Sequence, residues 1–499
     1  MSMTHAQDVL KDENLGQRLA ELVAFLNASF REGTALHEVE RGIWKHVLQM
    51  GHLAEKQFLA LHGSGDLGET VTLPDGQTCR RLPALHERRY LSIFGEFHLS
   101  RTVYGTREGQ QHTFVPLDNR LSLPASAFSY VLQDWDQALC VEEAFGPVQA
   151  TIARMLELTQ SVGSLEHMNR EMAAEATRYL LNRPVPPTKE EGAVLVASAD
   201  GKGIVMRPGP EAKAPKAHRT KGDKASQKRM ATVGAVYTVD RYVRTPEEVL
   251  AALFRDEREK CKGRPRPQHK HVWASLPQDD GSASGMAAVF AWLNWELRLR
   301  NPGRNKEAVY LCDGQEALWQ AVQNELPDTN AVQILDLLHV TPRLWKAAHV
   351  FHAEKSPEAE TFVRQRVLRV LQGKAEGVIR GLREMATKRG LTGNKKKTIR
   401  EICGYLEKNR ERMRYDEYLA KGYPIASGVI EGACRHLVKD RMERAGMHWT
   451  AAGAQAMLDL RSVFVSGQWQ EYQSYRIALE TQRLYPHREA AEPPFCMAS

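Results

Sequence analysis

Several features common in proteins are missing from this 499-residue sequence, and each absence excludes a class of protein. No apolar stretch is long enough to span a bilayer; the longest, such as residues 286 to 293, fall far short. The first residues hold four charged side chains between positions 8 and 13, where a secretory signal peptide needs an apolar segment. The sequence therefore predicts a cytoplasmic protein.

The cysteines lack any ordered spacing. There are seven, an odd number, and no two of them follow the C-x-x-C pattern. This distribution argues against a disulfide framework and against a zinc site built from cysteines, and it fits a reducing compartment.

The chain also lacks a strong overall charge, since its formal net charge is only +7. Lys and Arg are instead concentrated locally, in residues 202 to 229 and 393 to 414. Such segments indicate contact with a polyanion, although a solvated basic loop is the alternative for each of them taken alone.

The N-terminal part is predicted to be mostly helical around one β-ribbon. The ribbon is expected over residues 89 to 104, with a turn at Gly95-Glu96, because side chains alternate there in type. Two later helices joined by a glycine-containing turn fit either a helix-turn-helix or a plain helical hairpin. The helices are expected at residues 6 to 28, 35 to 63, 127 to 144, 147 to 158 and 165 to 181.

A different pattern follows the proline-rich boundary at residues 182 to 187. Three strands in succession and then alternating helices and strands imply a mixed sheet with helices on its faces. Residues 354 to 420 are helical in pattern and are best explained as an inserted bundle. The strands are expected at 193 to 199, 231 to 239, 271 to 276, 308 to 312 and 331 to 336.

Two aspartates are predicted at the ends of neighbouring strands. Asp200 follows an apolar run and precedes two glycines, and Asp313 ends a second strand and is also followed by glycine. Adjacent strands lie about 5 Å apart, so the two carboxylates can share a divalent cation such as Mg²⁺ or Mn²⁺. Taken alone, an Asp-Gly step after a strand is more often a turn.

A third acid, Glu431, falls in the opening turns of a late helix for which Ser427 is the expected N-cap. Arg435, four residues further on, is expected on the same helix face, where it pairs with the glutamate or meets a phosphate. Complementation of the helix dipole is the structural alternative for Glu431. The order of the three acids is the order in which an RNase H-like fold delivers two metal ligands from its sheet and one from its last helix.

Several strings of the sequence together resemble the ISKra-type insertion-sequence transposases, which are bacterial DDE enzymes. The strings are residues 198 to 203, 230 to 237, 311 to 319, 334 to 340 and 427 to 449, within a resemblance that covers roughly residues 70 to 470. The resemblance implies that Asp200, Asp313 and Glu431 bind two Mg²⁺ (or Mn²⁺) ions. It also implies that the enzyme cuts element ends and joins a 3′-hydroxyl to target DNA.

The resemblance assigns supporting roles as well. Asp336 and His339 match an Asp-x-x-His element that lies beside the active site in such enzymes. The alternative is an aspartate that caps the next helix together with a buried histidine. Trp319 and Trp345 have the right type to stack on an unpaired base, with buried core tryptophans as the alternative.

The expected partners are double-stranded DNA, namely terminal repeats and target, and further copies of this chain in a homodimer or a higher assembly. Relatives often carry paired cysteines near the ribbon, but here only Cys79 lies in that region, so no zinc is predicted. The expected DNA-binding residues are Lys202, Arg219, Lys221, Lys228, Arg229, Trp319, Trp345, Lys395, Lys396 and Lys397.

The predicted fold is an α/β catalytic core, an RNase H-like mixed sheet flanked by helices, with a helical insertion and an N-terminal α+β DNA-binding region. An RNase H-like nuclease or resolvase without strand transfer, and a catalytically idle transposase-derived DNA-binding protein, remain as alternatives. The expected segments are a helical region (1–75), the β-ribbon (76–118), a helical region with the helix-turn-helix candidate (119–188), the core (189–340 and 421–470), the helical insertion (341–420) and a C-terminal tail (471–499).

Overall fold

A computed structural model of the chain divides into two compact units, one formed by residues 1–169 and 470–499 and the other by residues 170–469. This division is coarser than the seven segments expected from the sequence. The residues that the structure describes are 15–106, 114–207, 228–256, 263–278, 282, 284–326, 330–444 and 446–486.

The first unit combines helices with small antiparallel sheets. A three-stranded sheet has the order β1-β2-β5, and β3 pairs with β4 as a separate ribbon. Its strands are β1 (Thr70–Thr72), β2 (Thr78–Arg81), β3 (His86–Ser92), β4 (Gly95–Arg101) and β5 (Tyr104–Gly105). Its helices are α2 (Leu15–Glu32), α3 (Leu36–Leu61), α4 (Pro116–Leu121), α5 (Tyr130–Cys140), α6 (Phe145–Leu156), most of α7 (Val162–Ala173), and α20 (Trp469–Leu484).

Two expectations for this unit need correction. The ribbon forms, but Ser92 pairs with Gly95, so the turn residues are Ile93 and Phe94 rather than Gly95-Glu96. Gly95 has a φ of +133° and follows the turn, because it supplies the backbone conformation needed to re-enter the strand. The helix expected over 165 to 181 is divided into α7 and α8 (Ala176–Asn182).

The second unit is built on a five-stranded mixed sheet with the order β10-β9-β6-β7-β8. The strands β6, β7 and β8 are successive antiparallel neighbours, whereas β6, β9 and β10 run parallel. The strands are β6 (Val194–Val205), β7 (Lys228–Val239), β8 (Gln268–Ser275), β9 (Glu307–Cys312) and β10 (Val332–Leu335). The mixed sheet expected from the sequence is therefore confirmed.

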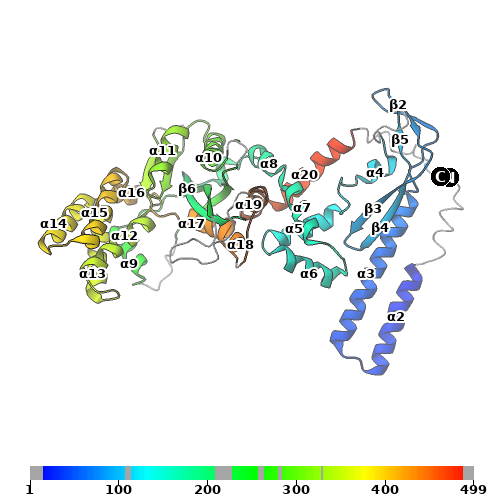
Figure 1. The fold of residues 1–499 in the computed structure, drawn as a ribbon, viewed down its shortest axis with the longest axis horizontal. Coiled ribbons are helices and arrows are strands. Elements are labelled where there is room, and N and C mark those ends of the chain that lie inside the picture. Colours follow the sequence, from blue (N-terminus) through cyan, green and yellow to red (C-terminus); the bar gives the residue numbers. More distant parts are fainter. Residues whose placement is uncertain are drawn as a thin grey trace, which may run out of the picture. The chain divides into compact units, whose positions relative to one another are not determined.

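Helices cover both faces of this sheet, and Figure 1 shows α10 (Met286–Arg300) and α17 (Gly428–Ala433) on opposite sides of β6. On the α10 face, Gly234 of β7 has no room for a side chain, since a Cβ there would lie 2.7 Å from Val289. The close approach of helix and sheet depends on this glycine. The other helices around the sheet are α9 (Pro246–Phe254), α11 (Glu316–Glu325), α12 (Leu337–Phe351), α18 (Asp440–Met442) and α19 (Ala451–Val465), with short helical turns at Thr188–Glu190 and Arg410–Arg412.

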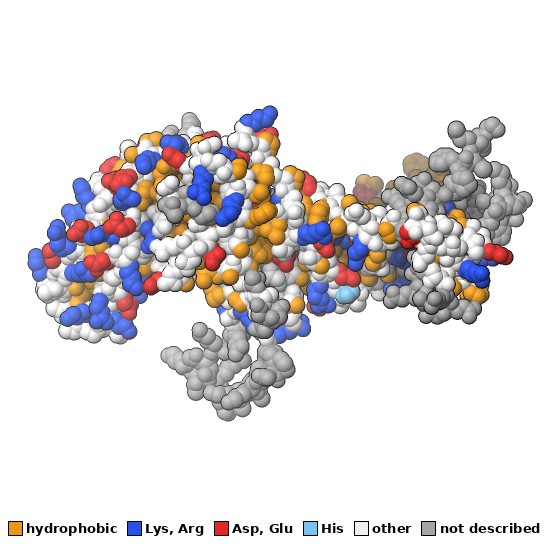
Figure 2. All heavy atoms as spheres, turned by 90° about the horizontal axis from the view of Figure 1, so that it is seen from above, with side chains coloured by type: hydrophobic (Ala, Val, Ile, Leu, Met, Phe, Trp, Pro, Cys, Tyr) orange, Lys and Arg blue, Asp and Glu red, His pale blue; other side chains and the backbone are white. Residues whose placement is uncertain are grey.

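Residues 354 to 420 are helical, as the pattern predicts, and their buried apolar side chains continue the core of the sheet. Figure 1 shows these helices side by side at one end of the unit, and Figure 2 shows Lys and Arg mixed with Asp and Glu on their surface. They are α13 (Pro357–Leu371), α14 (Ala375–Lys388), α15 (Gly393–Lys408) and α16 (Tyr415–Ala420).

None of the helices in the described ranges combines the length and the apolarity that crossing a bilayer requires.

Candidate metal and DNA site

Three aspartates lie just past the last paired residues of three adjacent parallel strands. Ala197 of β6 and Tyr310 of β9 form the last register pair between these strands, and Asp200 and Asp313 each follow that pair by three residues. Leu335 of β10 pairs with Cys312, which brings Asp336 level with Asp313. Residues at one level of parallel strands point to the same face, about 5 Å apart from strand to strand.

The structure corrects the local environment expected for Asp200. Asp313 does follow the end of its strand, but β6 continues through Asp200 and its glycines to Val205. The strand continues because β7 supplies antiparallel partners beyond the last pair with β9; Asp200 pairs with Val233, for example. Asp200 therefore lies at the point where the parallel ladder stops and the β6–β7 ribbon goes on.

Glu431 approaches this face on α17. The N-cap Ser427 accepts a hydrogen bond from the Ile430 backbone N–H at 3.2 Å, as the sequence predicts. Its Oγ also lies 3.4 Å from the Oγ of Ser198, which alternates to the same face of β6 as Asp200. One helical turn later, Cys434 donates from Sγ to Asp200 Oδ2 at 3.5 Å. The helix that carries Glu431 thus contacts the strand that carries Asp200 at two points.

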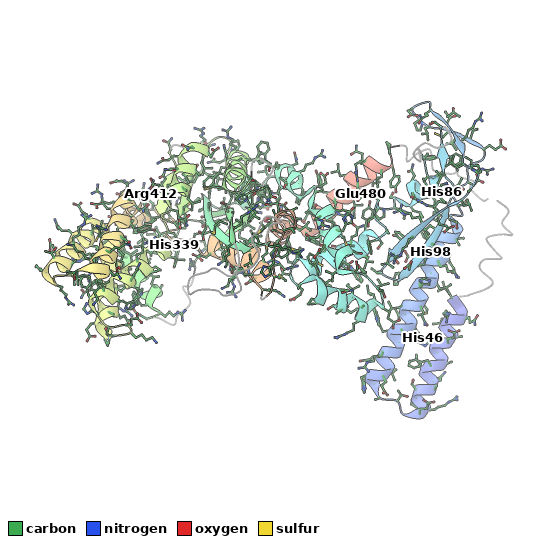
Figure 3. All side chains as sticks on the ribbon, viewed as in Figure 1. His46, His86, His98, His339, Arg412 and Glu480 are labelled. Atoms are coloured by element: carbon green, nitrogen blue, oxygen red, sulfur yellow. The ribbon has the colours of Figure 1, made fainter. Side chains whose placement is uncertain are left out.

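His339 connects Glu431 with the aspartates, and Figure 3 labels this histidine on α12. Its Nε2 lies 3.6 Å from Glu431 Oε1, and its side chain is 28% exposed. Its Nδ1 is buried and has no hydrogen-bond partner among the described residues. This histidine therefore links α12, which is capped by Asp336, to the acid on α17.

Asp336 connects two helices through hydrogen bonds to its carboxylate. Its Oδ1 accepts from the Leu338 N–H at 2.8 Å and thereby caps α12. Its Oδ2 accepts from the Ser427 N–H at 3.2 Å, just before α17. The carboxylate is 1% exposed and holds together the helices that carry His339 and Glu431. The capping alternative is thus present in the structure, and the same contacts give Asp336 a supporting position beside the acids.

The electrostatics of these acids favour protonation. Burial raises the pKa of Asp313, and the charge of Asp200 raises it further, against the opposing effects of the Gln315 N–H, His339 and Arg343. Burial also raises the pKa of Asp336, and the charge of Glu431 adds to the effect. Asp313 and Asp336 are thus withdrawn from water beside other acids, a condition that a bound cation relieves.

Two buried cysteines beside the acids are positions that the sequence patterns did not single out. Burial and the neighbouring aspartates raise the pKa of Cys312 to about 12, and burial and Asp200 raise that of Cys434. Both side chains therefore stay neutral thiols at physiological pH. Cys434 also opens a π-helical turn (Cys434–Lys439), a distortion that frequently marks functional sites.

The helical insertion reaches the site through Tyr405 of α15. A Cβ at Gly314 would lie 2.3 to 2.5 Å from atoms of the Tyr405 ring, so only glycine fits after Asp313. The guanidinium of Arg343 lies over the same ring, 3.4 Å from its centroid. The backbone beside Asp313 is therefore packed between the sheet and the insertion, a contact that no local pattern in the sequence indicates.

The expected DNA-binding residues near the sheet are only partly visible. Lys202 and Lys228 both pair with Glu443, at 3.8 and 3.0 Å, and Arg229 donates to the Pro277 carbonyl. They lie on β6 and β7 rather than in a loop. Arg219 and Lys221 fall outside the described residues.

The two tryptophans have different surroundings. Trp319 is 3% exposed and has the guanidinium of Arg412, which Figure 3 labels, 4.2 Å from its ring centroid. It is a core residue, so stacking on a base is excluded in this arrangement. Trp345 is half-buried and lines a surface hollow together with Pro342 and His349, and its ring lies tilted against that of His349 with the centroids 5.8 Å apart.

Within the described ranges, none of the remaining predicted residues forms an ion pair with Asp200, Asp313 or Glu431. Arg435 pairs with Asp440 at 3.4 Å rather than with Glu431, because the π-helical turn changes the angular spacing along this segment. Lys395, Lys396 and Lys397 are exposed in the first turn of α15, where Lys397 lies 4.0 Å from Glu401.

The side chains at the site are of the type that binds a hard divalent cation, but they are not arranged as a complete set of ligands. Asp200, Asp313 and Glu431 supply carboxylate oxygens, which Mg²⁺ and Mn²⁺ prefer. Within the described ranges, however, no three His, Cys, Asp or Glu side chains come close enough together to hold an ion.

Neither the protein-family models nor the curated proteins searched contain a match to this chain.

Proposed function

We propose that this chain is a DNA transposase of the DDE type, whose RNase H-like core cleaves DNA and joins its ends with the help of Mg²⁺ or Mn²⁺. The observation that carries the proposal is the position of Asp200 and Asp313 just past the last register pair of β6 and β9, with Glu431 brought to the same face by α17. The resemblance of the surrounding strings to the ISKra-type transposases supports the same assignment.

The sheet order supports the RNase H-like part of the proposal. Numbered along the sheet's own strands, the order is 3-2-1-4-5, with the second strand antiparallel to the others. An RNase H-like core requires this order, because it puts the first and fourth strands side by side at the centre. The two aspartates then meet at the centre of the sheet rather than at its edges.

The cation would be held by Asp200, Asp313 and Glu431, and it would stabilise the attacking and leaving oxygens of an in-line displacement at phosphorus. The residues of the chain provide the rest of the site. Asp336 fixes α12 and α17 against each other, and the neutral thiol of Cys434 orients Asp200 through its hydrogen bond. His339, with its Nε2 3.6 Å from Glu431 Oε1, positions the third of the proposed ligands.

The test is a strand-transfer assay with a DNA fragment that carries the sequences flanking the gene, a plasmid target, and Mg²⁺ or Mn²⁺. We expect the wild-type chain to cut the fragment and join it to the plasmid. Asp313→Asn is expected to bind the fragment but to give no product. Glu384→Gln, which changes an exposed acid on α14 to its amide, serves as the matched comparison and is expected to retain cleavage and joining.

Other outcomes select the alternatives. Cleavage without joining would identify a nuclease or resolvase of the same fold. Binding of DNA by the wild type with no cleavage under either metal, and with Asp200→Ala binding equally well, would identify an idle DNA-binding descendant. Joining requires two ends at once, so we also expect a homodimer or a higher assembly on DNA, measurable by light scattering of the complex.

A further inference from the structure

A cavity of about 790 Å³ lies along the flank of α17, next to the carboxylate site but outside it. Two glycines of the helix, Gly428 and Gly432, line it, so the cavity comes within one residue of Glu431. Its volume is in the range of small-molecule sites. A volume of this size matches a nucleotide or two of an extended strand better than a duplex.

The cavity wall is strongly cationic. It contains four Lys or Arg side chains and a single acid, Asp240, which accepts a hydrogen bond from the Ala193 N–H at 3.3 Å. Three of the cations, Arg264, Arg266 and Lys270, have no ion-pair partner within the described ranges. A cavity with unpaired positive charge selects an anionic ligand.

Packing does not require glycine at positions 428 and 432, since both have room for a side chain. A Cβ at Gly428 would meet nothing within 4 Å, and one at Gly432 would meet only His436, at 3.9 Å. Glycine inside a helix costs roughly 0.5–1 kcal/mol relative to alanine. Open glycines occur in other helices of this chain, as at Gly381, but these two face a cationic cavity. Their bare backbone allows a ligand to approach the helix closely.

An aromatic side chain completes the wall. Tyr242 lines the cavity and is partly exposed, with the guanidinium of Arg244 5.5 Å from its ring centroid. Cationic grooves with an aromatic ring are the usual means of binding single-stranded nucleic acid, since phosphates contact the cations and bases stack on the rings.

We propose that this cavity binds a single-stranded segment of DNA, with phosphates on Arg264, Arg266 and Lys270 and with the strand packed against Gly428 and Gly432. The inference deepens the proposed function, because it assigns one strand of the substrate to a place beside Glu431. It concerns the strand that leads away from the reacting phosphate, and not the carboxylate site itself.

The experiment measures binding of a short fluorescein-labelled single strand to the full chain by anisotropy, in EDTA so that no chemistry occurs. Gly432→Ala is expected to weaken binding about tenfold, because the added methyl fills the approach. Its melting temperature is expected to be equal to or above that of the wild type. Gly428→Ala is the second variant of this kind, and Gly381→Ala, on α14, is the control with unchanged binding.

The cations are tested through the salt dependence of the same binding. For each phosphate contact removed, as in Arg264→Ala or Arg266→Ala, the slope of log K against log salt is expected to fall by about 0.7. A nucleoside monophosphate is included as a competitor. We expect it not to displace the strand, and competition at equal concentration would overturn the proposal in favour of a mononucleotide site.

Binding by Gly432→Ala, Arg264→Ala and Arg266→Ala that equals the wild type in affinity and in salt slope would also overturn this proposal. The proposed function fails by a different result, namely the absence of metal-dependent cleavage and joining by a wild-type chain that still binds the single strand. The two failures are therefore distinguishable, since the binding assay needs no metal and no reaction.

Discussion

Two clusters of ionisable side chains in the second unit have different surroundings. Glu296 of α10 is 3% exposed and receives Arg183 at 2.5 Å and His271 at 2.8 Å. Burial alone would raise its pKa, but the hydrogen bond from His271 and the charge of Arg183 outweigh burial and lower the pKa to about 2. Asp313 and Asp336, by contrast, have raised pKa values and one partly exposed histidine between them and Glu431.

The difference separates a structural cluster from a candidate functional one. The Glu296 cluster has a partner for each carboxylate oxygen, so it is complete within the chain. The partners of Asp336 are backbone N–H groups, and the pKa values of Asp313 and Asp336 are raised by burial and neighbouring acids against the opposing charge of His339. The contrast lies in the charged partners: Arg183 pairs directly with Glu296, whereas among the described residues no Lys or Arg forms an ion pair with Asp313 or Asp336.

We expect the largest effect from a substitution in the candidate functional cluster. Asp313→Asn removes a proposed metal ligand, and we expect metal-dependent joining to fall by roughly a thousandfold or more. Stability without metal is expected to stay constant or to rise, because repulsion with Asp200 disappears. Strand-transfer rates and thermal unfolding in EDTA measure the two effects. A marked loss of stability would contradict the comparison.

The next largest effect is expected from a substitution in the structural cluster around Glu296. Arg183→Met leaves Glu296 buried with His271 as its remaining partner, and we expect a loss of about 3–5 kcal/mol in the free energy of unfolding. Urea denaturation of the second unit measures this loss. Arg435→Met, which removes an exposed ion pair with Asp440, is the matched control and is expected to cost less than about 1 kcal/mol. If the two variants lose the same free energy of unfolding, the buried cluster is no more stabilising than an exposed ion pair.

A smaller effect concerns the contact between the insertion and Asp313. Gly314→Ala forces Tyr405 to move, and overpacking of this kind costs about 1–3 kcal/mol. We expect joining to fall as well, because the backbone beside Asp313 shifts. The double variant Gly314→Ala/Tyr405→Ala restores space for the methyl group and is expected to regain part of the activity. Thermal unfolding and joining assays on both variants decide, and no rescue would contradict the steric explanation.

The smallest effects are in the pH dependence of stability. Glu296 has a folded-state pKa of about 2 against an ordinary value of 4.5, so its contribution is complete above pH 4.5 and is lost as pH falls towards 2. Burial raises the pKa of Asp459 from 3.8 to about 7, so its contribution is complete below pH 3.8 and is lost as pH rises towards 7.

Urea midpoints measured across this pH range check both signs. Glu296→Gln is expected to flatten the loss at low pH. Asp459→Asn keeps an acceptor for the Trp273 N–H and is expected to flatten the decline between about pH 4 and 7. A wild-type profile that these two variants leave unchanged would contradict the assignment of both groups.

The sequence by itself determined the features that depend on local pattern. The strand that ends before Asp313, the Ser427 cap, the helical insertion and the succession of strands and helices along the chain were all predictable, because periodicity and capping act over a few residues. The likeness of several strings to a transposase family gave the functional hypothesis for Asp200, Asp313 and Glu431.

The tertiary structure decided what depends on partners far away in the chain. β6 runs on past Asp200 because β7 pairs with it, Trp319 is buried under Arg412, and Arg435 turns to Asp440 after the π-helical turn. Tyr405 meets Gly314 across about ninety residues of sequence. Such contacts arise when the sheet and the insertion pack together, and packing energies between distant segments leave no periodic signal in either one.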